Sequence, residues 1–108
     1  MMTKETDKTN VIGIVQQYAD LVNSAFEPKK IFLFGSYAKG NYREESDIDV
    51  AVVLKDFENV MDIQLELMKL RRKIDNRIEP HPFREQDFEQ SNPLAHEILK
   101  YGQEILST

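Results

Sequence analysis

The stretch FLFGSYAKGNYREESDIDVAVVL, residues 32–54, decides the fold, because it encloses a polar loop between two apolar runs. The first run ends at Gly35, and the second carries Asp47 and Asp49 among its aliphatic residues. Successive side chains point to opposite faces of a strand, so both aspartates would project from one face and the aliphatic residues from the other. Two carboxylates on a part-buried face repel each other unless a cation relieves the repulsion. The pattern predicts strand, loop and strand, with an acidic site where the second strand begins.

Three helices are predicted in the rest of the chain, two of them from hydrophobic spacing. Apolar residues recur at three- and four-residue steps, which is typical of one helix face. The first face carries Val11, Val15, Tyr18, Val22 and Ala25, and the second carries Val60, Ile63, Leu67, Leu70 and Ile74. Asn10 is a suitable N-cap for the first helix. A last helix is predicted to begin with Asn92 as N-cap and Pro93 at its first position, and to end at Gly102.

Three strands are predicted, at residues 30–34, 48–54 and 76–83. The third contains Pro80 and Pro82, which confine it to a sheet edge or a short pairing, since proline lacks the N–H of a ladder. The order of elements is helix, strand, strand, helix, strand, helix. This order predicts a small α/β or α+β domain built on a three-stranded sheet.

Composition limits the classes of function. The chain has 108 residues, a formal net charge of -5 and no cysteine, which excludes disulfides and thiolate metal sites. The acidic balance argues against broad nucleic-acid binding, which depends on a basic face. No apolar run is long enough to cross a membrane and the N-terminus has no apolar signal core, so the cytoplasm is the expected compartment. Residues 1–9 are expected to form a flexible N-terminus, and residues 10–108 a single domain.

The loop and the acidic strand suit a nucleotide bound with metal. Gly35 has no side chain, so a phosphate can approach the backbone, and Ser36 adds a hydroxyl donor. The next residues, YAKG, predict a short helical turn whose N–H groups favour an anion. Asp47 and Asp49 could converge on a pair of cations about 3.5–4 Å apart, and oxygen ligands favour Mg²⁺ or Mn²⁺. Ser46 serves either as a nucleotide contact or as a simple turn hydroxyl.

The segment GSYAKGNYREESDIDVAVV resembles the signature of the nucleotidyltransferase superfamily that includes DNA polymerase β. Specifically, it resembles the minimal nucleotidyltransferases of bacteria and archaea, which implies a polymerase β-like core with a three-stranded mixed sheet flanked by helices. The resemblance also implies that Gly35 and Ser36 hold a nucleoside triphosphate and that Asp47 and Asp49 are catalytic and bind metal. A third catalytic carboxylate follows on a later strand in the family. Its match here is Glu79 in NRIEPHPF. From spacing alone, Glu79 could equally be a solvated glutamate of an edge strand.

For several polar residues near the predicted site, two interpretations remain open. Arg77 and His81 share a strand face with Glu79 and are expected to border the site, although His81 lies between two prolines and suits a structural role equally well. Lys39 and Arg43 either contact the triphosphate or are solvated loop cations.

The resemblance implies a partner as well as a reaction. Minimal nucleotidyltransferases are paired in the family with a helical HEPN protein, as antitoxin and toxin. The expected reaction is Mg²⁺-dependent transfer of AMP from ATP to a hydroxyl, a tyrosine of the HEPN ribonuclease, by a homodimer or a hetero-oligomer with the toxin. The first alternative is a non-catalytic module that neutralises the toxin by binding it. The second is a free-standing nucleotidyltransferase for a small molecule or a nucleic-acid end, which the expected absence of a second domain makes less favourable.

Overall fold

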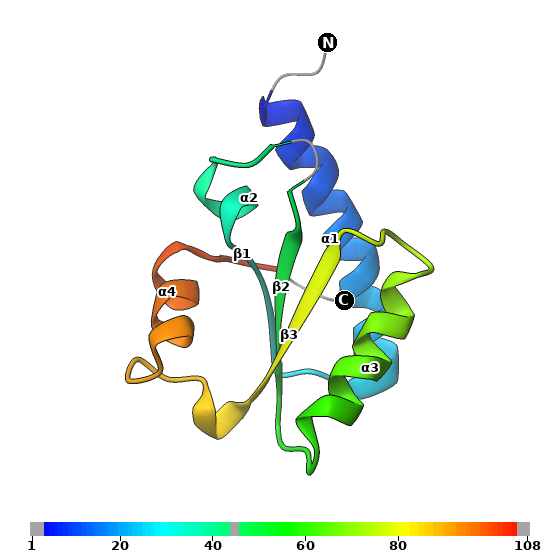
Figure 1. Ribbon diagram of the computed structural model, residues 1–108, viewed down its shortest axis with the longest axis vertical. Coiled ribbons are helices and arrows are strands. Elements are labelled where there is room, and N and C mark those ends of the chain that lie inside the picture. The colour runs from blue at the N-terminus through cyan, green and yellow to red at the C-terminus, as the bar shows by residue number, and fades with distance from the viewer. Residues whose placement is uncertain (1–3, 44–45, 106–108) are drawn as a thin grey trace.

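The computed structural model describes the backbone of residues 4–43 and 46–105, with side chains from Lys8 onward. Helices lie on both faces of one mixed sheet (Figure 1). The elements are α1 (Lys4–Phe26), β1 (Lys30–Phe34), α2 (Ser36–Lys39), β2 (Ile48–Leu54), α3 (Val60–Arg71), β3 (Ile78–Arg84), the 3-10 helix η1 (Glu85–Asp87), α4 (Pro93–Tyr101) and β4 (Gln103–Glu104). None of the helices in these ranges is long and apolar enough to cross a membrane. The predicted α/β class is confirmed.

The sheet has the strand order β3-β2-β1-β4. β1 pairs antiparallel with β2, and β2 pairs parallel with β3, so the sheet is mixed as expected. The expectation of three strands was wrong, because β4 pairs antiparallel with β1 through Phe32–Glu104 and Leu33–Gln103. Both residues of β4 are exposed and polar, so the hydrophobic pattern contains no sign of this strand.

β3 lies at the edge of the sheet, where its two prolines predicted it. The carbonyl of Ile78 accepts a hydrogen bond from Arg71 of α3, and that of Pro80 accepts one from Gln64. Ile78 and Pro80 therefore point their backbone polar groups away from β2. Pro82, two residues further along the strand, points the same way. Neither proline removes an N–H from the ladder with β2, which is why the strand tolerates both.

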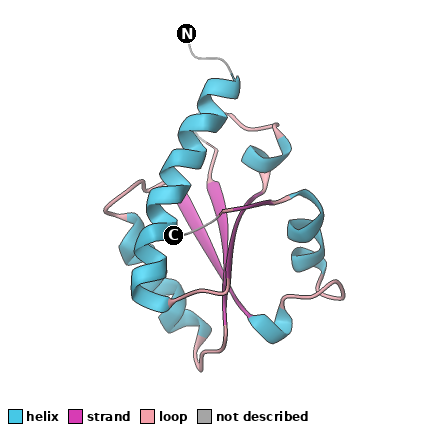
Figure 2. Ribbon diagram, turned by 180° about the vertical axis from the view of Figure 1, so that it is seen from behind, coloured by secondary structure: helices cyan, strands magenta, loops and turns pink. Residues whose placement is uncertain are grey.

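Different helices cover the two faces of the sheet (Figures 1 and 2). α1 and α3 pack on one face, where Tyr18 is buried and donates a hydrogen bond of 2.7 Å to the carbonyl of Leu67. α4 packs on the other face, where Phe32, Phe34, Ala51 and Ile98 form a smaller buried cluster. The even-numbered residues of β2 belong to the first core, so Asp49 lies on the face that α4 covers only in part.

α1 departs from the prediction at its start and in the burial of one residue near its end. It begins at Lys4, so Asn10 lies inside the helix and the predicted N-cap was wrong. In Figure 1 its first turns extend beyond the sheet, where they have no core to mark them in the sequence. Ala25 is exposed and Ala19 is buried in its place. Residues 1–3 of the predicted flexible N-terminus lie outside the described residues, and the domain boundaries stay a prediction.

The caps of the other helices follow the sequence closely. Asn59 and Asn92 accept hydrogen bonds from the first N–H groups of α3 and α4, and Pro93 begins α4. Gly102 ends α4 as predicted. Val60 is 47% exposed and does not join the core, because it stands at the first position of α3.

Candidate active site

A glycine turn at the end of β1 meets an acidic side chain of β2. Gly35 has φ 73° and ψ -149°, a conformation that only glycine adopts readily, and α2 begins at the next residue. A Cβ added at Gly35 would overlap Oδ2 of Asp49 and lie 3.1 Å from its Cγ. α2 ends at Gly40 in the left-handed conformation, as the sequence predicted. The structure therefore brings Gly35 and Asp49, two of the predicted site residues, into direct contact.

The acidic residues lie across two neighbouring strands. Asp49 is the register partner of Glu79 in the parallel pair and of Phe34 in the antiparallel pair. Register partners on adjacent strands are about 4.8 Å apart and point to the same face. Asp47 is exposed and stands just before β2. The sheet therefore places Asp49 and Glu79 side by side, with Asp47 two residues before Asp49.

Two basic side chains already contact these carboxylates. Nε2 of His81 donates to Oδ1 of Asp49 at 3.1 Å, and Nη1 of Arg71 lies 3.7 Å from Oε2 of Glu79. In the part of the chain that the structure describes, no three histidine, aspartate or glutamate side chains form a group that could hold a metal ion. Sequence reasoning expected His81 to border the site, and it does. It did not anticipate Arg71, because a contact from α3 to β3 leaves no local pattern.

Aromatic stacking and hydrogen bonds connect α2 with the residues that follow it and with Arg77. The rings of Tyr37 and Tyr42 stack with centroids 4.4 Å apart, and the Tyr37 hydroxyl donates to the carbonyl of Arg43. Arg77 donates to that hydroxyl and pairs with Asp75 at 2.9 Å. The hydrogen bonds from Arg77 lower the pKa of Asp75 below its ordinary value. Arg77 therefore acts on the loop rather than on Glu79.

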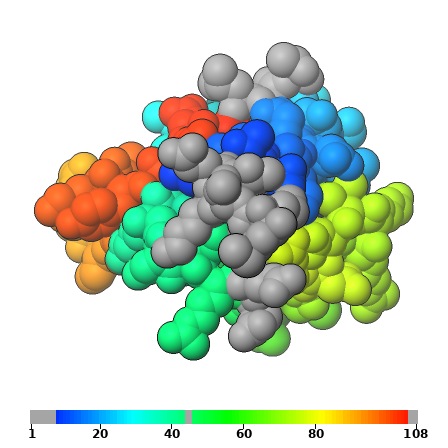
Figure 3. All heavy atoms as spheres, turned by 90° about the horizontal axis from the view of Figure 1, so that it is seen from above, coloured from blue at the N-terminus to red at the C-terminus, as the bar shows by residue number. Residues whose placement is uncertain are grey.

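The remaining predicted contacts also have partners within the chain. The Ser46 hydroxyl accepts the backbone N–H of Arg43 at 2.7 Å, which is the turn role that was one of its two interpretations. Lys39 is hydrogen-bonded to Glu97 and lies over the ring of Tyr101, so it joins α2 to α4. Figure 3, viewed from the end where α2 lies, shows α2 beside α4. Whether Ser46 also binds nucleotide stays a prediction.

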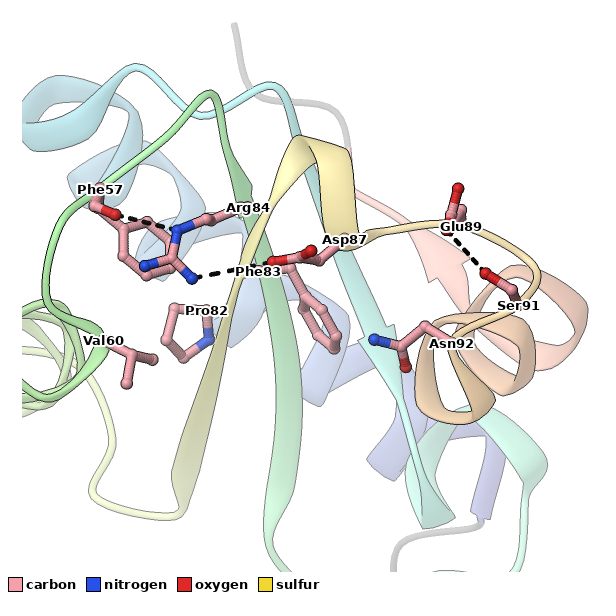
Figure 4. Close-up of a pocket in the computed structure, with 9 residues that line it drawn as sticks. All are labelled: Phe57, Val60, Pro82, Phe83, Arg84, Asp87, Glu89, Ser91 and Asn92. Carbon is pink, nitrogen blue, oxygen red and sulfur yellow. Dashed lines mark hydrogen bonds and ion pairs between the residues drawn. The ribbon is translucent and has the colours of Figure 1, made fainter.

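A separate pocket lies at the far end of β3 (Figure 4). Its volume is about 340 Å³. It is lined by Phe57, Val60, Pro82, Phe83, Arg84, Asp87, Glu89, Ser91 and Asn92. Arg84 occupies one wall, stacks on the Phe57 ring and donates to two backbone carbonyls. None of the predicted site residues lines this pocket, so we place the candidate site at Gly35 and Asp49 and not in it.

A glycine turn beside carboxylates on a small mixed sheet suits proteins that hold nucleotide phosphates next to acidic residues. The chain matches the family "Polymerase beta, Nucleotidyltransferase" over residues 16–108. It belongs to that family, and the resemblance noted in its sequence is confirmed.

Individual relatives agree with this family. "Putative protein adenylyltransferase MJ0604" of Methanocaldococcus jannaschii is 42% identical over 57 residues, which cover 50% of this chain and 57% of that relative. The match thus spans little more than half the length of that curated relative. A "putative nucleotidyltransferase" from Sulfolobus solfataricus has the same fold, with a TM-score of 0.70 and 20% identity over 99% of this chain and 90% of that one. A chain in a crystal structure of a toxin-antitoxin with AMP-PNP has a TM-score of 0.64 and 26% identity, covering 86% of this chain and 73% of its own.

Proposed function

We propose that this chain transfers AMP from ATP to a protein hydroxyl, a tyrosine of a HEPN-type toxin, and acts as the antitoxin of that toxin. The observation that carries the proposal is the contact between Gly35 and Asp49. Only a residue without a side chain lets a phosphate-binding turn lie directly against a carboxylate of the neighbouring strand. Asp47 and Glu79 lie beside Asp49, so the turn and the acids serve one substrate.

The residues at the site fit a divalent cation by their chemistry. Asp47, Asp49 and Glu79 supply only oxygen donors, which suit Mg²⁺ or Mn²⁺. Two of the three already attract a basic side chain of the chain itself, which is the behaviour of carboxylates that lack another counter-charge. When bound, such a cation supplies charge neutralisation on the phosphates and a lower pKa for the acceptor hydroxyl.

The chain's own residues bind the nucleotide and orient it. Gly35 and Ser36 would hold the triphosphate, through backbone N–H groups and the Ser36 hydroxyl. Tyr37 stacks on Tyr42 and accepts a hydrogen bond from Arg77, which positions α2 and the residue Tyr42 after it. Glu79 would accept the proton of the attacking hydroxyl, after Arg71 has released it. The hydroxyl oxygen forms a bond to the α-phosphorus, the bond to the β-phosphate bridge breaks, and pyrophosphate leaves.

The proposal that the acceptor is a toxin protein is supported by similar proteins. One curated relative carries the name protein adenylyltransferase, which supports a protein as acceptor. A similar solved structure is a toxin-antitoxin with AMP-PNP, an analogue of ATP, which supports a toxin partner and an adenine nucleotide. The HEPN class of the partner and the tyrosine acceptor come from the resemblance of the sequence to minimal nucleotidyltransferases.

A second candidate function is neutralisation by binding alone. The ion pair of Glu79 with Arg71 and the lack of a preassembled metal group among the described residues favour it. In that case the chain would keep the outline of the site but silence the toxin without modifying it.

The test of the proposal uses labelled ATP. The complex of this chain with its partner is incubated with Mg²⁺ and ATP labelled at either the α- or the γ-phosphate. Label from the α-position should remain on the partner and label from the γ-position should not, because the β- and γ-phosphates leave as pyrophosphate. Asp47→Asn and Asp49→Asn should abolish the α-label.

Asp62→Asn serves as the matched control, since Asp62 is an exposed acid on α3. It should leave the α-label unchanged. Label from the γ-position on the partner would instead indicate phosphoryl transfer and contradict the proposal.

A further inference from the structure

Asp49 is held from both neighbouring strands. Its Oδ1 accepts a hydrogen bond of 3.1 Å from Nε2 of His81 on β3. Its Oδ2 faces Gly35 at the end of β1, where any Cβ would overlap it. A carboxylate only accepts hydrogen bonds, so Nε2 of His81 carries the proton of this contact. Together the two contacts fix the plane of the Asp49 carboxylate.

His81 reaches Asp49 because of the register between β2 and β3. Its register partner is Ala51, two residues beyond Asp49, and the small side chain of Ala51 leaves room above β2. The imidazole packs edge-on against the Phe34 ring, with centroids 5.0 Å apart. The side chains of His81 and Asp49 are 32% and 26% exposed, so the pair is accessible from solvent and still held by packing.

We propose that His81 is a positioning residue, whose Nε2–H orients the Asp49 carboxylate for the divalent cation that accompanies the nucleotide. This inference rests on the proposed metal role of Asp49. A free carboxylate turns about its terminal torsion, which is broad, and the hydrogen bond removes that freedom before a ligand arrives. Loss of such a supporting hydrogen bond typically costs about 10–100-fold in metal affinity or activity.

Two substitutions separate the hydrogen bond from the ring. His81→Phe keeps a ring that can pack on Phe34 but has no N–H group. His81→Gln loses the ring and keeps an N–H donor of similar reach. The second histidine, His96, is exposed on α4 and contacts Gln90, so His96→Phe is a matched control for the same chemical change.

The readout is Mn²⁺ affinity in the presence of AMP-PNP, measured by electron paramagnetic resonance, which needs no turnover. His81→Phe should weaken Mn²⁺ binding by about 10-fold or more, while His81→Gln stays near the wild-type value. His96→Phe should bind as the wild type does. In transfer assays, His81→Phe should raise the KM for metal more than it lowers kcat at saturating metal. Thermal melting checks that each variant is folded.

The outcomes separate this inference from the proposed function. If Asp49→Asn loses Mn²⁺ and His81→Phe does not, the role of His81 is wrong and that of Asp49 stands. If Asp49→Asn binds Mn²⁺ like the wild type, both are wrong. Equal weakening in His81→Phe and His81→Gln would show that an N–H donor at this position does not restore Mn²⁺ binding, and would overturn the inference. If His81→Phe does not fold, the comparison of His81→Ala with His81→Gln decides in the same way.

Discussion

Gly35 and Asp49 show how a single residue controls the site. The backbone of Gly35 lies in a region of φ and ψ that is almost exclusive to glycine, and its Cα faces the carboxylate. Any side chain at this position would both strain the turn and displace Asp49. The glycine is therefore required by the geometry of two strands at once.

Gly35→Ala tests this requirement. We expect the free energy of unfolding to fall by about 1–3 kcal/mol, from the strained backbone alone. We also expect loss of AMP transfer, because Asp49 must move. Chemical denaturation and the transfer assay measure the two effects.

Gly13→Ala is the matched control for this substitution. Gly13 lies inside α1 and a Cβ there would meet no atom within 4 Å. Alanine should stabilise the helix by about 0.5–1 kcal/mol. If Gly35→Ala behaved as Gly13→Ala does, the account of the turn would be wrong.

The positions of the acids could be predicted from the sequence, but their partners could not. Asp47 and Asp49 stand out because they interrupt an apolar strand, and Glu79 stands out because it is the acid inside the next strand. The contacts of Asp49 with His81 and of Glu79 with Arg71 depend on the register of β3 and on where α3 crosses it. No local spacing encodes either one.

At the scale of elements, the strength of the hydrophobic signal decides what the sequence predicts. β1 and β2 have the predicted bounds, because each is a short apolar run bordered by polar residues or glycine. β4 and the start of α1 were missed, since both lie at the margin of the core and expose their side chains or extend past the sheet. Backbone pairing with β1, not propensity, forms β4.

The contact between α1 and α3 gives a test at this scale. The Tyr18 hydroxyl is buried and donates to the carbonyl of Leu67, and burial raises the pKa of Tyr18. Tyr18→Phe should lower the free energy of unfolding by about 1–2 kcal/mol, because one hydrogen bond between the helices is lost.

Tyr101 provides the control, since it is 51% exposed on α4. Tyr101→Phe should change stability by less than about 0.5 kcal/mol. Denaturant unfolding of the two variants gives the comparison. Equal effects would mean that the buried hydrogen bond is not what stabilises the packing of α1 on α3.

The ion pair between Asp75 and Arg77, in the turn before β3, should make the stability of the protein depend on pH. The hydrogen bonds from Arg77 lower the pKa of Asp75 below its ordinary value of 3.8. The pair therefore stabilises the folded state at pH values above the pKa that this carboxyl has in the unfolded chain. The contribution should disappear as pH falls through the lowered pKa of Asp75. Because Arg77 is 37% exposed, the effect is screened and amounts to about 1 kcal/mol at most.

Comparing the wild type with Asp75→Asn across pH measures this contribution. The stability difference between them should be constant above about pH 5 and shrink below about pH 4. Asp20→Asn, at an exposed acid on α1, is the control for the loss of a negative charge. A difference between wild type and Asp75→Asn that grew toward low pH would contradict the assignment.

At the scale of the whole molecule, the two faces of the sheet have different tasks. One face is closed by α1 and α3 and contains the larger core, and the other is covered in part by α4 and carries Asp49 beside Glu79. A stable closed face allows the open face to carry charges that do not contribute to packing. An acceptor side chain of a partner protein would approach this open face.

The measurement that tests the central claim most directly is the intact mass of the proposed partner, a HEPN-type toxin, after incubation with this chain, ATP and Mg²⁺. The account predicts that the partner gains the mass of AMP with the wild-type chain. It predicts no gain with Asp49→Asn, although the complex still forms. An unchanged partner mass with the wild-type chain, in a complex whose toxin is nevertheless silent, would contradict the claim and leave neutralisation by binding alone.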